Sequence, residues 1–100
     1  MDAVKLFEQS TPIFTALGDP TRQRILLILA EKSVGVSEIT ESLKISQPAT
    51  SNHLKILHRA GLVSVEKIGQ QRIYTLTPLE AVGTVKELMA AIEHACEEEI

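Results

Sequence analysis

The chain has 100 residues, a formal net charge of −3 at pH 7 and one cysteine. This length predicts one domain, residues 1–100, with a modest core that pairing with a second copy would help. One cysteine excludes an internal disulfide framework, and no apolar run approaches the ~20 residues of a membrane span. Because Lys5 and Glu8 interrupt any N-terminal signal peptide, we expect a cytoplasmic protein with no membrane partner.

The charge is distributed unevenly along the chain. Residues 44–74 hold five basic residues and one acidic residue, a local charge of +4, whereas residues 75–100 hold one basic and six acidic residues, a local charge of −5. The local field, rather than the total charge, steers a charged ligand. The middle of the chain is therefore compatible with nucleic acid, although ordinary surface variation explains the distribution equally well.

The start of the chain predicts helices with clear capping signals. Residues 2–9 form a helix, and Thr11 with Pro12 gives a cap-plus-proline signal that restarts it, either as a separate helix or as one kinked helix. Asp19 and Pro20 repeat this signal and open the most apolar helix, which we expect in the core.

Residues 37–60 predict two helices joined by a tight turn, which is the pattern of a helix-turn-helix. Ser37 caps the shorter helix, Ser46 caps the longer one, and Gly61 ends the longer one with a positive φ. Leucines at helical spacing face inward. The outer face has no acid and offers amides, hydroxyls and nitrogen bases, which bond to base edges and phosphates. Its residues are Gln47, Thr50, Ser51, Asn52, Lys55 and His58.

The periodicity changes after this helix. Residues 62–67 and 72–76 are rich in β-branched residues, and residues 68–71 between them contain one glycine. Residues 62–76 therefore predict a hairpin, and residues 33–36, upstream of the helix-turn-helix, predict a loop. A hairpin directly behind a helix-turn-helix makes a winged helix-turn-helix, a mainly α fold with a β-hairpin wing.

Residues 78–98 predict a last helix, which opens with a capping box of Thr77 and Glu80 and with Pro78 at its first position. An apolar stripe follows it at spacings of three and four residues. Because the compact domain is already complete before this helix, the stripe predicts a homodimer through the terminal helices. A helix packed only on its own chain is the alternative. The residues expected at the dimer contact are Leu79, Val82, Val85, Met89, Ile92 and Cys96.

Two motifs in this order resemble the ArsR/SmtB family of winged helix-turn-helix repressors. They are LGDPTRQRIL at residues 17–26 and SQPATSNHLKIL at residues 46–57, the latter followed by AGLV at residues 60–63. The resemblance covers about residues 14–76. It implies a sequence-specific transcriptional regulator of double-stranded DNA, most often a repressor, in the cytoplasm of a bacterium or archaeon and on its nucleoid when bound to DNA.

The resemblance also implies that the helix after Ser46 enters the major groove. The N-terminal residues of a recognition helix reach deepest, so base-edge or adjacent phosphate contacts are expected at its start. Flanking residues and the wing are expected to meet phosphates or the neighbouring groove. The expected DNA-binding residues are Gln47, Thr50, Ser51, Asn52, His53, Lys55, Lys67, Gln70 and Arg72.

Many members of the family bind a metal ion, and both of their ligand motifs are incomplete in this sequence. Gly35 and Ser37 stand where the family has a cysteine pair, and neither replaces a thiolate. The C-terminal motif retains His94 and Glu97, but residues 81–83, where its other half would lie, offer no ligand. We therefore expect no metal site and no cofactor, and the effector stays open.

Three other functions are alternatives to a DNA-binding transcriptional regulator of this kind. Cys96 would support a thiol-responsive repressor, yet the glutamates at residues 97–99 disfavour its thiolate, and packing within the stripe explains it better. A winged helix that binds protein would tend to lose the basic wing and polar helix face that this chain keeps. An enzyme is not expected, because Ser51 and His53 point in different directions and no set of nucleophile, base and acid is evident.

Overall fold

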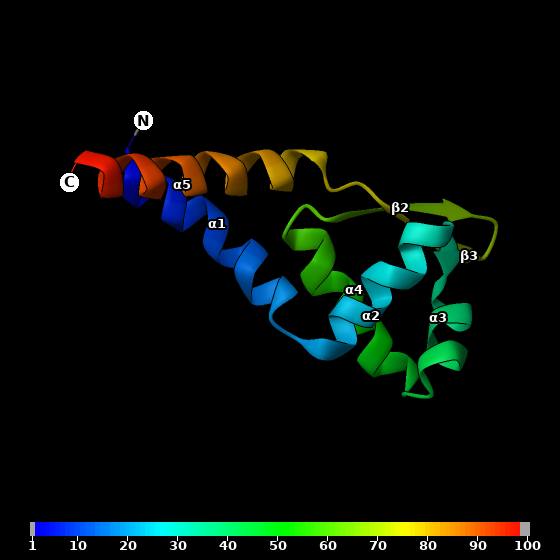
Figure 1. Cartoon of the computed structure of the whole chain (residues 1–100). Coiled ribbons are helices and arrows are strands. Elements are labelled where there is room, and N and C mark those ends of the chain that lie inside the picture. Colours follow the sequence, from blue (N-terminus) through cyan, green and yellow to red (C-terminus); the bar gives the residue numbers. More distant parts are fainter. Residues whose placement is uncertain (1, 99–100) are drawn as a thin grey trace.

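The computed structural model describes residues 2–98; Met1, Glu99 and Ile100, which the predicted domain included, lie outside the described residues. Within the described part, helices and strands follow in the order α1 (Ala3–Leu17), α2 (Pro20–Glu31), β1 (Val34–Gly35), α3 (Val36–Leu43), α4 (Gln47–Arg59), β2 (Val63–Ile68), β3 (Gln71–Leu76) and α5 (Leu79–Glu98). The chain is mainly helical with a β-hairpin, and the predicted winged helix-turn-helix is confirmed (Figure 1). No helix in residues 2–98 combines the length and the hydrophobicity that a membrane crossing requires.

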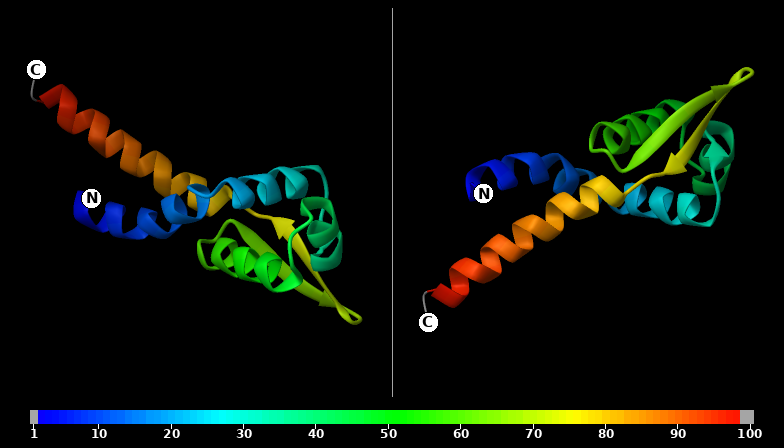
Figure 2. Two further views of the ribbon diagram at one scale, coloured as in Figure 1. Left: turned by 90° about the horizontal axis from the view of Figure 1, so that it is seen from below. Right: turned by 90° about the horizontal axis from the view of Figure 1, so that it is seen from above.

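The molecule is elongated, with principal extents of 55 × 23 × 21 Å. Helices α1 and α5 lie side by side and form an arm, while α2, α3, α4 and the hairpin form a body (Figure 2). Both chain ends lie on the arm, away from the hairpin tip (Figure 1). We use "arm" and "body" in this sense below.

Helix α1 is continuous, so of the two alternatives the single helix is confirmed and a separate helix that starts at Thr11 is wrong. Asp2 caps the helix by accepting the Val4 N–H at 3.0 Å. The Thr11 hydroxyl donates to the Phe7 carbonyl at 2.8 Å instead of capping a new helix. Pro12 lies inside the helix and is exposed, so water can reach the carbonyl that its missing N–H leaves unpaired.

Two local features of the body differ from the prediction. Residues 33–36 were expected to be a loop, but Val34 and Gly35 form β1, which pairs antiparallel with β3 at Tyr74 and Ile73. Because α3 then begins at Val36, its cap position falls on Gly35 and Ser37 does not cap it. A two-residue strand has no periodicity of its own, and only its partner in the sheet identifies it.

The sheet has the order β1-β3-β2 and is antiparallel throughout. In the hairpin Val63 pairs with Leu76 and Ile68 pairs with Gln71, so each strand extends one residue further toward the turn than predicted. Gly69 adopts a φ of 63° in the two-residue turn, a conformation that suits glycine. Beyond Val63, β2 is exposed, and the hairpin tip stands free of the body.

The core joins the helix-turn-helix to α2 and to the start of β2. Its fully buried side chains include Ile25, Ile39, Leu54 and Leu57. The arm continues this core, and α5 packs along α1 through the buried side chains of Leu88 and Ala81. The domain was expected to be complete without α5. This expectation is wrong, because one side of α5 packs on α1 and belongs to the domain.

Helix α5 begins one residue later than predicted. The Pro78 carbonyl accepts the Val82 N–H at 2.8 Å, which places Pro78 at the cap and Leu79 at the first helical position. The proposed capping box of Thr77 and Glu80 is thus out of register with the helix start. A shift of one residue at a helix end is within the usual variation of such boundaries.

Candidate nucleic-acid interface

Helix α4 begins and ends as local sequence rules predict. The Ser46 hydroxyl accepts the Ala49 N–H at 3.2 Å, which satisfies one of the free donors of the first turn. At the other end Gly61 takes a φ of 76°, its N–H donates to the His58 carbonyl at 3.0 Å, and the Leu62 N–H donates to the Leu57 carbonyl at 3.1 Å. These two bonds form a Schellman motif, which aims the chain into β2.

The two faces of α4 have different chemistry. Leu54 and Leu57 are buried in the core. The exposed side carries Gln47, Ser51, Asn52 and Lys55, as the sequence predicted, and the helix contains no Asp or Glu. An exposed helix face of amides, a hydroxyl and an ammonium group can donate to and accept from base edges and can bind phosphates.

Thr50 does not lie on this face, and the prediction that placed it there is wrong. It is 0% exposed, and its hydroxyl donates to the Ser46 carbonyl at 3.1 Å and accepts from the Thr40 hydroxyl at 2.9 Å. Positions 50, 54 and 57 share one side of a helix, so the spacing to Leu54 could have revealed its burial. Thr50 joins the two helices of the helix-turn-helix instead of facing a ligand.

His53 is the second expected contact that the structure places differently. Its side chain is 20% exposed, and its Nδ1 lies 3.2 Å from Nη1 of Arg22 and 4.0 Å from Oδ2 of Asp19. The imidazole is therefore turned toward the start of α2, not outward as a phosphate contact would require. The contacts of Asp19 and Arg22 with His53 were not predicted, since Arg22 and His53 are 31 positions apart in the sequence.

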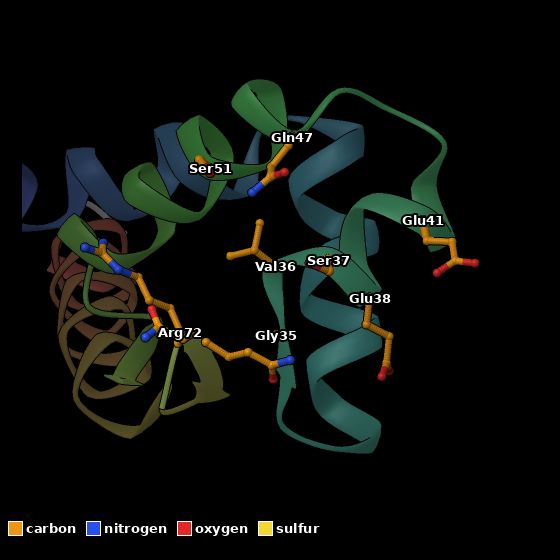
Figure 3. A pocket seen from close by; sticks show the side chains of 10 residues that line it. Gly35, Val36, Ser37, Glu38, Glu41, Gln47, Ser51 and Arg72 are labelled. Atoms are coloured by element: carbon orange, nitrogen blue, oxygen red, sulfur yellow. The ribbon is translucent and has the colours of Figure 1, made fainter. Parts of the chain in front are cut away.

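One open hollow connects α4 with the wing. It has a volume of about 610 Å³, and Gln47 and Ser51 of α4 line it together with Gln70 and Arg72 of the hairpin. Figure 3 shows the Gln47 side chain pointing from α4 into this hollow. Four of the residues that the sequence assigned to DNA binding are thus brought to one surface, although the turn and wing residues are more than 15 positions from the helix residues.

Two acidic residues on the rim of the hollow were not predicted from the sequence. Glu38 and Glu41 of α3 line it on the side opposite to Arg72, and both side chains are exposed (Figure 3). Glu38 forms an exposed ion pair with Lys32 at 3.7 Å. These carboxylates repel phosphates, so the electrostatically favourable path for a DNA backbone lies toward α4 and the wing, away from α3.

The wing carries two cations at paired positions. Lys67 of β2 lies directly opposite Arg72 of β3 in the antiparallel register, and both are exposed. Like charges at directly opposed positions destabilise a hairpin. A polyanion next to both side chains would remove this repulsion, which favours a wing that contacts phosphates.

No metal site is gathered within residues 2–98: no group of three or more His, Cys, Asp or Glu side chains is arranged to hold an ion. Gly35 lies in β1 and Ser37 in the first turn of α3. Cys96 is exposed on α5 and forms no disulfide within the described chain.

This fold and surface define the class of protein: a winged helix-turn-helix with a polar recognition-helix face and a basic wing is a DNA-binding regulator. A family model described as "Bacterial regulatory protein, arsR family" matches residues 19–65. An uncharacterized HTH-type transcriptional regulator of Methanocaldococcus jannaschii is 40% identical over 88 residues, which cover 87% of this chain and 94% of that relative. The chain therefore belongs to the ArsR family of transcriptional regulators, and it is a regulator, not an enzyme.

Two further similarities agree with this assignment. The HTH-type transcriptional repressor SmtB of Mycobacterium tuberculosis is 33% identical over 96 residues, covering 96% of this chain and 69% of the relative. The solution structure of a homodimeric winged helix-turn-helix DNA-binding domain from Mycobacterium bovis, a possible ArsR-family regulator, superposes with a TM-score of 0.73 at 25% identity, covering 92% of this chain and 86% of that one.

Proposed function

We propose that this ArsR-family protein is a homodimeric, sequence-specific repressor that binds an operator through α4 and the wing. The observation that carries the proposal is the shared hollow: Gln47 and Ser51 of the recognition helix and Gln70 and Arg72 of the wing line one surface. A duplex that enters this surface meets base-reading groups on α4 and charged groups on the hairpin at the same time. The resemblance to a mycobacterial repressor supports repression, and we infer that the protein acts on DNA in the cytoplasm of a bacterium or archaeon.

The exposed residues divide into two roles by their chemistry. Gln47 and Asn52 have side-chain amides that both donate and accept, as an adenine edge requires, and Ser51 can bond to a base or an adjacent phosphate. Lys55, Lys67 and Arg72 are exposed cations that suit phosphates, and Gln70 in the turn suits the flanking groove or backbone. Thr50 and His53 are left out of the interface because both are held within the body.

The arm supplies the dimer contact in this proposal. On α5 the apolar side chains of Val82, Met89 and Ile92 are 42%, 50% and 43% exposed, and Leu79 is still more exposed. Val85 is half-buried and Cys96 is exposed along the same stripe. Exposed apolar side chains that continue in one row along a helix mark an interaction surface. Helix α1 adds the exposed side chain of Phe7 to the arm.

A second copy of the chain is the partner that fits this row. The mycobacterial domain that superposes on this chain is a homodimer. A two-fold dimer would present two α4 helices to one duplex, and such dimers read half-sites about one helical turn, roughly 34–36 Å, apart. Dimerisation through the arm leaves the wing and the start of α4, which lie away from the arm, free for DNA (Figure 1).

Selection of bound sites from random duplexes tests the proposal directly. We expect an inverted repeat whose half-sites are centred about 10 base pairs, or a multiple of this, apart. Binding should weaken steeply as the salt concentration rises, because phosphate contacts release counterions. Recovery of no preferred duplex, or of a single unrepeated site, would contradict the proposed repressor dimer.

A further inference from the structure

Three helices meet at the guanidinium group of Arg22, in the first turn of α2: the preceding helix α1, α2 itself and the distant helix α4. Its Nε donates to the Ala16 carbonyl at 2.9 Å and its Nη2 donates to the Thr15 carbonyl at 2.9 Å, both in the last turn of α1. Its Nη1 lies 3.2 Å from Nδ1 of His53, in the middle of α4. One side chain of α2 thus connects the end of the arm helix α1 with the recognition helix.

The chemistry of arginine suits this position. The last carbonyls of a helix have no partner within the helix, and α1 has no basic residue in its last turn. The Arg22 guanidinium donates to the carbonyls of Ala16 and Thr15, the latter of which also accepts the Gly18 N–H at 3.3 Å, and it places positive charge at the negative end of the α1 dipole. Its planar fork keeps a further N–H available for His53, an arrangement that the single ammonium group of lysine cannot reproduce.

The contact between Arg22 and His53 requires one particular tautomer of the imidazole ring. A guanidinium group only donates, so in this contact Nδ1 of His53 acts as the acceptor, which requires the tautomer that has its N–H at Nε2. The Asp19 carboxylate lies on the same side, 4.0 Å from this Nδ1, and accepts the backbone N–H of Arg22 at 3.0 Å. That backbone hydrogen bond lowers the pKa of Asp19, so the carboxylate is charged at neutral pH and helps to hold Arg22 in place.

We propose that Arg22 and His53 are positioning residues, which fix the direction of the recognition helix α4 relative to the arm. The arm holds the two protomers together and α4 enters the groove, so the angle between them sets the distance between the two recognition helices of a dimer. A duplex offers half-sites only at the spacing of its helical turn. A small rotation of α4 should therefore lower the affinity for the operator more than the affinity for other duplexes. A duplex without half-sites places no such demand on the angle. This inference rests on the proposed function and on its dimer.

Four variants separate positioning from direct contact. His53→Leu removes the acceptor and keeps the bulk of the side chain, and His53→Gln restores an acceptor through its amide oxygen. Arg22→Lys keeps the charge but loses the three-way fork. His58→Leu is the matched control, since His58 is an exposed histidine in the last turn of the same helix, outside this network and not among the residues expected to bind DNA.

The experiment measures the Kd of each variant for the selected operator and for an unrelated duplex of equal length, well below each variant's melting temperature. We expect His53→Leu and Arg22→Lys to weaken operator binding roughly tenfold, the value of one hydrogen bond to a charged group, and to change binding of the unrelated duplex by less than about twofold. His53→Gln should recover most of the loss, and His58→Leu should behave as the wild type.

Each other outcome decides against the inference in a recognisable way. An equal loss on both duplexes in His53→Leu would identify a phosphate contact, and no loss on either duplex would show that the link has no role in binding. A loss in His53→Leu that His53→Gln does not restore would show that the acceptor is irrelevant. A wild-type protein that prefers no duplex would instead contradict the proposed function itself.

Discussion

The hydroxyl oxygens of Thr40 and Thr50 lie 2.9 Å apart, one on each helix of the helix-turn-helix. Thr50 donates its proton to the Ser46 carbonyl at 3.1 Å and accepts from Thr40, whose single proton is shared between Thr50 and the Val36 carbonyl, 2.8 Å away. The pair connects the interior of α3 to that of α4 with no charged group. This part-buried bond helps to fix how the two helices cross, because it joins α3 to α4, whereas the other bond of each hydroxyl stays within its own helix or helix cap.

This relationship predicts a measurable coupling. Thr50→Val keeps the shape of the side chain and removes its hydroxyl, and it should lower the free energy of unfolding by about 1–2 kcal/mol. The single variants Thr40→Val and Thr50→Val and the double variant form a cycle that chemical denaturation can measure. We expect an interaction of at least about 0.5 kcal/mol, as is usual for residues in contact. Strictly additive effects would show that the two hydroxyls do not stabilise each other.

A substitution at Ser10 should change the stability of the fold in the opposite direction. This residue of α1 is 0% exposed, and its hydroxyl has no hydrogen-bond partner among the described residues. Ser10→Ala removes an unsatisfied buried polar group and introduces a better helix former, so it should stabilise the fold by about 1 kcal/mol or more. Thermal unfolding is the measurement, and a lower melting temperature would mean that this hydroxyl has a partner, such as a buried water or the second protomer. Thr84→Ala on α5 is a control, because the Thr84 hydroxyl donates to the Glu80 carbonyl.

Met89→Glu tests the arm as the dimer contact. Met89 is 50% exposed in the single chain, so the substitution should leave the monomer folded. In a dimer the new carboxylate would be buried without a partner, which costs enough to prevent association. Sedimentation should show a dimer for the wild type and a monomer for the variant at micromolar concentration. Ala90→Glu adds the same charge at the next, exposed position, on another side of α5, and should remain a dimer; a wild-type monomer would rule this contact out.

Gln47→Ala and Arg72→Ala should affect DNA binding differently. Removing the Gln47 amide should cost roughly 1–3 kcal/mol on the preferred site and relax the choice of base at one position. Removing Arg72 should weaken all duplexes more evenly and flatten the logarithmic salt dependence by about 2 units for the dimer, from about 0.9 per phosphate contact. Titrations at several salt concentrations on matched and altered operators measure both effects. If Arg72→Ala changed the base preference at one position and left the salt dependence of binding unchanged, the wing would contact bases instead of phosphates.

Metal ions should not release the protein from its operator. Gly35 and Ser37 cannot supply thiolates, and the residues 81–83 that precede His94 and Glu97 on α5 offer no ligand. Titration of zinc, nickel, cadmium and arsenite against the protein–operator complex should therefore leave the complex intact, with the EDTA-treated protein as the reference. Stoichiometric, tight release by any of these ions that disappears in His94→Ala would refute this expectation.

The sequence by itself determined the elements whose signals are local. Asp19, Ser46 and Gly61 act on backbone groups within a few positions of themselves, so their roles at the ends of α2 and α4 could be read from neighbouring residues. The hairpin followed from β-branched residues around one glycine. Most of the polar face of α4 followed from the absence of leucines and acids on one side of the helix. These features together were enough for the fold, and the family followed from the resemblance of residues 17–26 and 46–57 to the motifs of ArsR/SmtB repressors.

Only the tertiary structure decided which side chains are turned inward and which segments meet. Thr50 is polar, and whether a polar helix residue faces solvent or a neighbouring hydroxyl depends on where α3 lies. His53 is held by Arg22, which is 31 positions away, and β1 exists only because β3 lies beside it. The packing of α5 on α1 through Leu88 likewise depends on two ends of the chain meeting. Such contacts depend on the relative placement of whole elements, which the short-range rules of capping and periodicity do not contain.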